Sequence, residues 1–149
     1  MQQVEDIEIL LVEDSPLDAE LTMRGLRAEK LANNIVWLKD GEQAMDYLFR
    51  RGDYADRPAT TPRLVLLDLK MPKVDGIEVL RAIKSNEATR RIPVVIMTSS
   101  QEESDIAQSY ELGVNSYVVK PIEFDSLATV AKNAGFYWLA VNRPASPLP

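Results

Sequence analysis

The sequence predicts one α/β domain built around a parallel β-sheet. Four short apolar runs and a fainter fifth run alternate with segments of helical periodicity along the 149 residues. The runs are apolar at nearly every position, which is typical of strands that are buried on both faces of a parallel sheet. The length suits a single domain, and a hydrophobic share of 46% is ordinary for a globular protein.

The predicted strands are short and rich in β-branched residues. They cover residues 9–12, 35–38, 64–67, 93–97 and 117–119. The first helix is expected over about residues 16–31, because Ser15 and Pro16 form a capping pair in front of it. Leu17, Leu21 and Ala28 recur on one face of this helix, with Gly25 between them.

The remaining helices are marked by caps and by apolar spacing. Asp40 caps the second helix. The third begins after Asp75-Gly76 and carries Ile77, Leu80 and Ile83 at helical spacing. The fourth covers about residues 102–112 and ends at Gly113, a residue typical of helix C-termini. The fifth is expected over about residues 123–142, beyond which prolines end regular structure.

Strand and helix thus alternate five times, and a long polar loop over residues 51–62 precedes the third strand. Right-handed crossovers place helices on both faces of such a sheet. The sequence therefore predicts a doubly wound (βα)5, flavodoxin-like fold with strand order 2-1-3-4-5. Ligands of such sheets bind beyond the carboxyl ends of the strands, so functional residues are expected there.

The composition excludes several kinds of chemistry. The chain has no cysteine and no histidine, which excludes disulfides, thiolate or imidazole metal sites and histidine bases. A formal net charge of -6 disfavours a phosphate backbone, so no nucleic-acid partner is expected. The acidic N-terminus and the short apolar runs lack the features of a signal peptide or a membrane span. A cytoplasmic protein without membrane contact is therefore expected.

Reactive polar residues follow the strands of the predicted sheet. Glu13 and Asp14 follow the first strand, and Asp68 follows the third. Thr98 and Lys120 follow the fourth and fifth strands and offer a hydroxyl and an ammonium group. Three carboxylates at one edge repel one another unless a cation neutralises them, and Mg²⁺ prefers oxygen ligands. The sequence therefore predicts a Mg²⁺ site in which Asp68 is the best candidate for a nucleophile that forms an acyl phosphate.

Taken singly, these residues have ordinary explanations. An acidic residue at a strand end is usually a helix cap or part of a solvated turn, and Lys120 alone would be a surface lysine. Tyr117 alone would be a half-buried aromatic residue of an edge strand. Such residues on several adjacent strands, all at one edge, are much harder to assign to chance.

Over about residues 7–134 the chain resembles the receiver domain of two-component response regulators. The motifs that carry the resemblance are Glu13-Asp14, Asp68-Leu69-Lys70-Met71-Pro72-Lys73-Val74-Asp75-Gly76, Thr98-Ser99 and Lys120-Pro121 with Tyr117 before it. Thr98 lies thirty residues beyond Asp68, the spacing of the family. The resemblance implies a receiver domain over residues 1–142 and a proline-rich tail over residues 143–149.

The resemblance also implies the roles of individual residues. Asp68 would accept a phosphoryl group from a phosphohistidine of a sensor histidine kinase. Asp14, Asp68 and the backbone carbonyl of Lys70 would bind Mg²⁺, and Glu13 would reach the ion through water.

The resemblance also implies how the domain responds to phosphorylation and which proteins it contacts. Thr98 and Lys120 would contact the phosphoryl group, Tyr117 would turn inward on activation, and the peptide bond before Pro121 would be cis. Output is expected through protein contact. The polar loop and the segment Phe136-Tyr137-Trp138 also resemble those of stand-alone regulators that are paired with bacterial phytochrome kinases.

Two other classes of protein remain to be compared. A magnesium-dependent phosphatase of the haloacid dehalogenase type also uses an aspartyl nucleophile, but its pattern has an acid two residues later, where this chain has Lys70. A flavodoxin-like nucleotide binder needs a glycine-rich first turn, and residues 13–18 contain no glycine. The resemblance therefore favours a phosphoacceptor that is not an enzyme.

The C-terminal helix predicts an interface. At 100° per residue, Leu127 and Trp138 belong to one apolar stripe that should pack on the sheet. Phe136 points about 180° from Leu127, and Leu139 points about 120° from it, so both would face water in a monomer. The alternatives are a break at Gly135 or scattered exposed apolar residues. We expect a homodimer with Phe136 and Leu139 in its interface.

Overall fold

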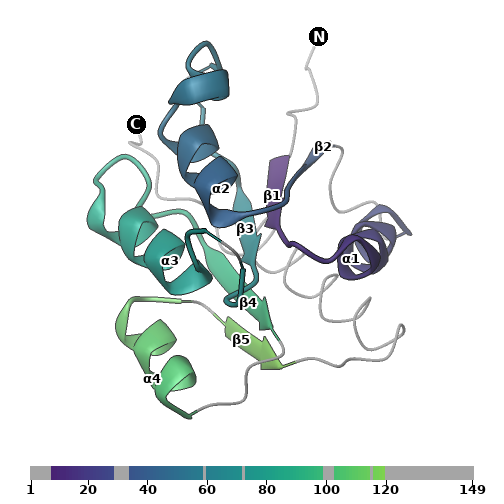
Figure 1. Cartoon of the computed structure of the whole chain (residues 1–149), viewed down its shortest axis with the longest axis vertical. Coiled ribbons are helices and arrows are strands. Elements are labelled where there is room, and N and C mark those ends of the chain that lie inside the picture. The colour runs from purple at the N-terminus through teal and green to yellow at the C-terminus, as the bar shows by residue number, and fades with distance from the viewer. Residues whose placement is uncertain are drawn as a thin grey trace, which may run out of the picture.

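The computed structural model describes residues 8–28, 34–58, 60–71, 73–98, 103–114 and 116–119. Its elements are β1 (Glu8–Val12), α1 (Pro16–Ala28), β2 (Asn34–Leu38), α2 (Gly41–Leu48), the 3₁₀ turn η1 (Gly52–Tyr54), β3 (Leu64–Leu67), α3 (Gly76–Ser85), β4 (Val94–Thr98), α4 (Glu103–Glu111) and β5 (Ser116–Val119). The strands form one parallel sheet in the order β2-β1-β3-β4-β5 (Figure 1). This confirms the predicted doubly wound fold and strand order.

Each central strand buries side chains on both faces of the sheet. α1 lies on one face, and α2 and α3 lie on the other (Figure 1). Ile9 and Leu11 of β1 belong to the apolar cluster on the α1 face, whereas Leu10 and Val12 belong to the cluster that includes α2 and α3. All four side chains are at most 1% exposed. This two-sided burial explains why the strands are apolar at nearly every position.

The buried face of α1 does not include Leu17. Leu17 is 69% exposed, whereas Ala19, Thr22 and Leu26 are buried. The buried positions follow one another at intervals of three and four residues, so they form the side of the helix that faces the sheet. At 100° per residue, Leu17 lies about 180° from Leu26. Of the apolar face that the sequence indicated, Leu21 packs against the core cluster, whereas Leu17 lies on the exposed side of the helix.

Two aspartates cap α2 and α3, of which the sequence predicted the cap at Asp40. Asp40 has extended backbone dihedrals, and its side chain accepts a hydrogen bond from the Gln43 amide. Asp75 has the same role at α3, where it accepts from the Glu78 amide. Each cap pairs an amide group that has no partner within the helix, which gives both helices a defined start.

The polar loop after α2 is more ordered than its composition indicates. The guanidinium of Arg57 stacks over the Tyr47 ring, with its central carbon 4.1 Å from the ring centroid, and donates a 2.8 Å hydrogen bond to the Tyr47 carbonyl. Tyr54 of η1 packs edge-on against the same ring. The Tyr47 hydroxyl donates to Glu8 at 2.6 Å, and burial together with this bond raises the pKa of Tyr47. The loop is thereby attached to α2 and β1.

Several predictions fall outside the described residues. These are the helix over residues 123–142, the tail over residues 143–149, and the site residues Lys120, Pro121, Phe136 and Leu139. α4 ends close to Gly113, whose φ of +96° suits a residue without a side chain. No helix among the described residues is long and apolar enough to span a bilayer.

Candidate functional site

Three carboxylates converge at the carboxyl end of the sheet. Glu13 and Asp14 follow β1, and Asp68 follows β3, its neighbour in the sheet. The pairing of Val12 with Leu67 brings the two strand ends to the same level. One carboxylate oxygen from each of the three residues lies within 4.8 Å of the others. Glu13 and Asp68 are buried, whereas Asp14 is exposed, so the cluster is open to solvent on one side.

Backbone hydrogen bonds hold the cluster in place. The Glu13 amide donates to the Leu38 carbonyl at 3.0 Å, and the Asp68 amide donates to the Val12 carbonyl at 3.0 Å. Both bonds continue the parallel ladders of the sheet one residue past the strands. The backbone positions of Glu13 and Asp68 are therefore fixed by the sheet.

Amide groups also contact two of the carboxylates directly. The Ser15 amide donates to Glu13 Oε2 at 3.2 Å, and the Lys70 amide donates to Asp68 Oδ1 at 3.4 Å. Both hydrogen bonds come from backbone amides, so each orients the carboxylate that accepts it. Glu13 and Asp68 therefore offer carboxylate oxygens that the fold already orients.

The donor set fits a hard divalent cation. Every ligand atom of the cluster is a carboxylate oxygen, which is the ligand type that Mg²⁺ and Mn²⁺ prefer. Three like charges within 4.8 Å repel one another, and a bound cation would offset that repulsion. The solvent-exposed side at Asp14 leaves room for water or an incoming anion to complete the coordination.

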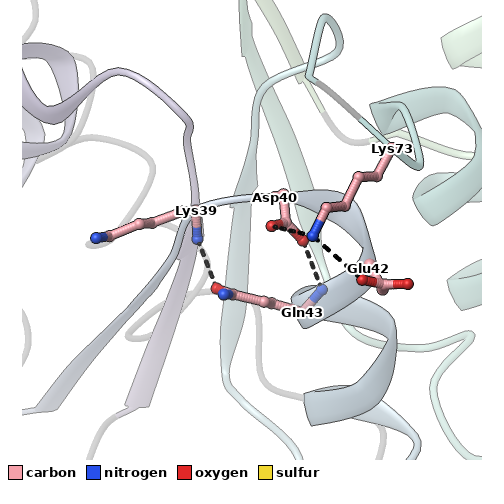
Figure 2. A network of polar contacts seen from close by, with 5 residues as sticks. All are labelled: Lys39, Asp40, Glu42, Gln43 and Lys73. Atoms are coloured by element: carbon pink, nitrogen blue, oxygen red, sulfur yellow. Dashed lines mark hydrogen bonds and ion pairs between the residues drawn. The ribbon is translucent and has the colours of Figure 1, made fainter.

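The loop after Asp68 is attached to α2. Lys73 extends toward the start of α2 and contacts two acidic residues, with Nζ 3.8 Å from Asp40 Oδ2 and 3.4 Å from Glu42 Oε1 (Figure 2). Gln43 joins this network, since its amide donates to Asp40 and its side chain accepts from the Lys39 amide. Lys73 has a φ of +67°, a backbone conformation that residues other than glycine rarely adopt. The two ion pairs are therefore made by a residue at a tight turn.

Thr98 and Tyr117, which are expected to respond to phosphorylation, lie on the neighbouring strands β4 and β5. Thr98 is the last residue of β4 and pairs with Val119 of β5, and Tyr117 of β5 pairs with Ile96. Lys120 directly follows β5 in the sequence but lies outside the described residues. The backbone therefore places Thr98 at the same edge as Asp68, one strand away.

The arrangement matches one known family over most of the chain. The family model of the response regulator receiver domain matches residues 9–132. This chain belongs to the response regulator receiver domain family. Membership confirms the predicted function, which is phosphoryl acceptance in two-component signalling.

Individual relatives of this receiver domain cover nearly the whole chain. The response regulator Rcp1 of Synechocystis is 42% identical over 93% of this chain and 93% of its own length. A probable methanogenesis regulatory protein of Methanothrix harundinacea, FilR2, is 45% identical over 93% of this chain and 88% of its own.

Solved structures of such proteins are also similar. The phosphorylated cyanobacterial phytochrome response regulator RcpA superposes with a TM-score of 0.87 at 39% identity, over 95% of this chain and all of its own. The Mn²⁺-bound form of Rcp1 superposes with a TM-score of 0.84 at 40% identity, over 93% of this chain and 99% of its own. A receiver domain this similar thus binds a divalent cation.

Some contacts of the receiver domain were not predicted from the sequence. They include the ion pairs of Lys73, a hydrogen bond from Trp37 to the carbonyl of Glu13, and an ion pair between Lys70 and Asp105 of α4. The partners lie too far apart in the sequence for a local pattern to predict these contacts. The sequence shows only that both lysines lie in the loop directly after Asp68.

Proposed function

We propose that this receiver domain accepts a phosphoryl group on Asp68 from the phosphohistidine of a sensor histidine kinase. The observation that carries the assignment is the position of Asp68: it directly follows the central strand β3, is buried, and lies within 4.8 Å of two further carboxylates. Glu13 and Asp14 follow β1 together, which suits a pair of metal ligands better than a nucleophile.

The proposed reaction is a phosphoryl transfer. A carboxylate oxygen of Asp68 forms a bond to phosphorus while the bond between phosphorus and the histidine nitrogen breaks, and the nitrogen keeps the electron pair. Asp14, Asp68 and the backbone carbonyl of Lys70 would hold Mg²⁺, with Glu13 acting through water. When bound, Mg²⁺ supplies positive charge against the phosphoryl oxygens. The carboxylate cluster supports this assignment of the metal site.

Two residues beyond the cluster complete the proposed phosphoryl site. Thr98 would donate its hydroxyl to one phosphoryl oxygen, and Lys120 would pair with another. Tyr117 would turn inward when Thr98 moves, and the peptide bond before Pro121 would be cis. The support is the parallel pairing of β4 and β5, which carries Thr98 and Tyr117 on adjacent strands.

The chain would retain the phosphoryl group as a signal and would not turn over external substrates. A haloacid dehalogenase type of phosphatase needs an acid two residues after the nucleophile, where this chain has Lys70. The formal net charge of -6 argues against direct contact with nucleic acid. We place the protein in the cytoplasm as part of this proposal.

We further propose a bacterial phytochrome as the partner kinase and a homodimer as the assembled form. The similarity to RcpA, described as a cyanobacterial phytochrome response regulator, supports the partner. The dimer rests on the sequence argument that Phe136 and Leu139 lie outside the apolar stripe of the C-terminal helix. Output would then pass through protein contact.

Labelling with a small phosphodonor tests the function directly. Incubation with Mg²⁺ and acetyl phosphate is expected to add the mass of one phosphoryl group per chain, stable to acid and labile to base. Omission of Mg²⁺ is the control and is expected to abolish the mass gain. Continuous release of inorganic phosphate at enzymatic rates would instead assign the chain to the phosphatases.

A further inference from the structure

The side chain of Trp37 contacts the main chain of the acidic cluster. Trp37 Nε1 donates a 2.8 Å hydrogen bond to the backbone carbonyl of Glu13. Trp37 belongs to the edge strand β2 and pairs with Leu11, two residues before Glu13. The indole therefore reaches along the sheet to the point at which β1 has ended.

This contact lies where the two strands separate. The Glu13 amide still donates to the Leu38 carbonyl, as a continued parallel ladder requires. At Asp40 the chain has left the strand and caps α2. The indole N–H thus supplies a side-chain donor to Glu13 just beyond the last paired residues of β1 and β2.

The indole itself is held on two sides. Trp37 is half-buried and packs against the apolar cluster that contains Ile9 and Leu11. The ammonium of Lys39 lies 5.5 Å from the centroid of the Trp37 ring, within the range of a cation–π contact. A large planar side chain that is packed in this way donates its N–H from a well-defined position.

The Glu13 carbonyl is part of the peptide unit that joins Glu13 to Asp14. A hydrogen bond to this oxygen restricts rotation of the peptide plane, and that rotation would turn both carboxylates of the β1 end relative to Asp68. We propose that Trp37 is a positioning residue for the divalent-cation site, acting through the Glu13 carbonyl. The inference rests on the proposed function, in which this cluster holds Mg²⁺.

The variant Trp37→Phe tests the role of the N–H group, because it keeps an aromatic ring on β2 and removes only the donor and part of the ring. We expect the dissociation constant for Mg²⁺, measured by titration calorimetry, to rise about fivefold, as for the loss of one hydrogen bond that orients ligands. The Mg²⁺ concentration that gives half-maximal labelling by acetyl phosphate should rise by the same factor, while the labelling at saturating Mg²⁺ stays at the wild-type level.

Ile35→Ala is the matched control. Ile35 lies on the same strand and packs in the same apolar cluster as Trp37, but the bond to the Glu13 carbonyl comes from Trp37. The control is expected to lower the melting temperature and to keep the wild-type affinity for Mg²⁺. Wild-type affinity in Trp37→Phe, or an equal loss in Ile35→Ala, would overturn the inference. Absence of Mg²⁺ binding by the wild type would instead overturn the metal site of the proposed function.

Discussion

The ammonium of Lys70 lies 3.1 Å from a carboxylate oxygen of Asp105, and this ion pair joins the loop after Asp68 to α4. The Lys70 side chain is 57% exposed and that of Asp105 is 15% exposed. The amide of the same lysine donates to Asp68 Oδ1. Lys70 therefore connects the proposed phosphoacceptor, through its backbone, with α4, through its side chain.

Changing either partner of this pair alters the charge beside the acidic cluster. Asp105→Asn removes a negative charge and is expected to lower the acetyl phosphate concentration for half-maximal labelling about twofold, because the donor is an anion. Lys70→Gln should raise it by a similar factor. Labelling rates at several donor concentrations measure both effects, and 0.5 M salt should reduce the difference. Wild-type values in both variants would show that the pair has no influence on the phosphodonor.

Asp68→Asn is expected to abolish labelling and to leave the fold intact, because an amide is neither a nucleophile nor a strong metal ligand. Without Mg²⁺, the loss of one of three clustered negative charges should raise the melting temperature by about 2–4 °C, corresponding to about 1 kcal/mol of relieved repulsion. Mass spectrometry and thermal unfolding measure the two outcomes. Wild-type labelling of Asp68→Asn at one site would show that another residue is the acceptor.

Asp14→Ala and Lys120→Ala are expected to separate metal binding from phosphoryl binding. The first should weaken Mg²⁺ binding and labelling together, because it removes a proposed ligand of the cation. The second should leave the affinity for Mg²⁺ close to the wild-type value and impair labelling. Titration calorimetry with Mg²⁺ distinguishes the two variants. An equal loss of Mg²⁺ affinity in both would contradict the separate roles.

Gly76→Ala is expected to destabilise the protein, although alanine normally favours a helix over glycine. A Cβ at this first residue of α3 would overlap the backbone carbonyl of Asp68 and the Cα of Leu69. Backbone atoms cannot move away cheaply, so we expect a loss of about 1–3 kcal/mol in the free energy of unfolding. Urea denaturation measures it. An unchanged or increased stability would show that the loop after Asp68 has room to shift.

If the protein dimerises through its C-terminal helix, replacing Phe136 and Leu139 with aspartate should yield monomers. Light scattering on the wild type should give the mass of a dimer, and the double variant Phe136→Asp, Leu139→Asp should give the mass of one chain. Charged groups in an apolar interface are costly to desolvate. The homodimer hypothesis is wrong if the wild type stays monomeric at high micromolar concentration, with and without acetyl phosphate.

The order of the strands and the residues at their carboxyl ends were predictable from the sequence alone. Buried parallel strands have a local signature, and a parallel sheet brings their carboxyl ends to one edge. Glu13, Asp14 and Asp68 could therefore be grouped before any coordinates were known, and they do lie together. The cap at Asp40 was predictable because its hydrogen bond is local and joins Asp40 to an amide three residues away.

Contacts between distant segments were decided only by the tertiary structure. The spacing of Leu17 and Leu21 groups them on one face of α1, yet Leu21 packs against the core cluster whereas Leu17 is 69% exposed. Trp37 and Glu13 lie 24 residues apart, and the bond between them depends on how β1 and β2 pair and separate. The need for glycine at position 76 likewise comes from the approach of α3 to Asp68. Local patterns record the preferences of neighbouring residues, whereas these contacts depend on the packing of elements that are far apart in the chain.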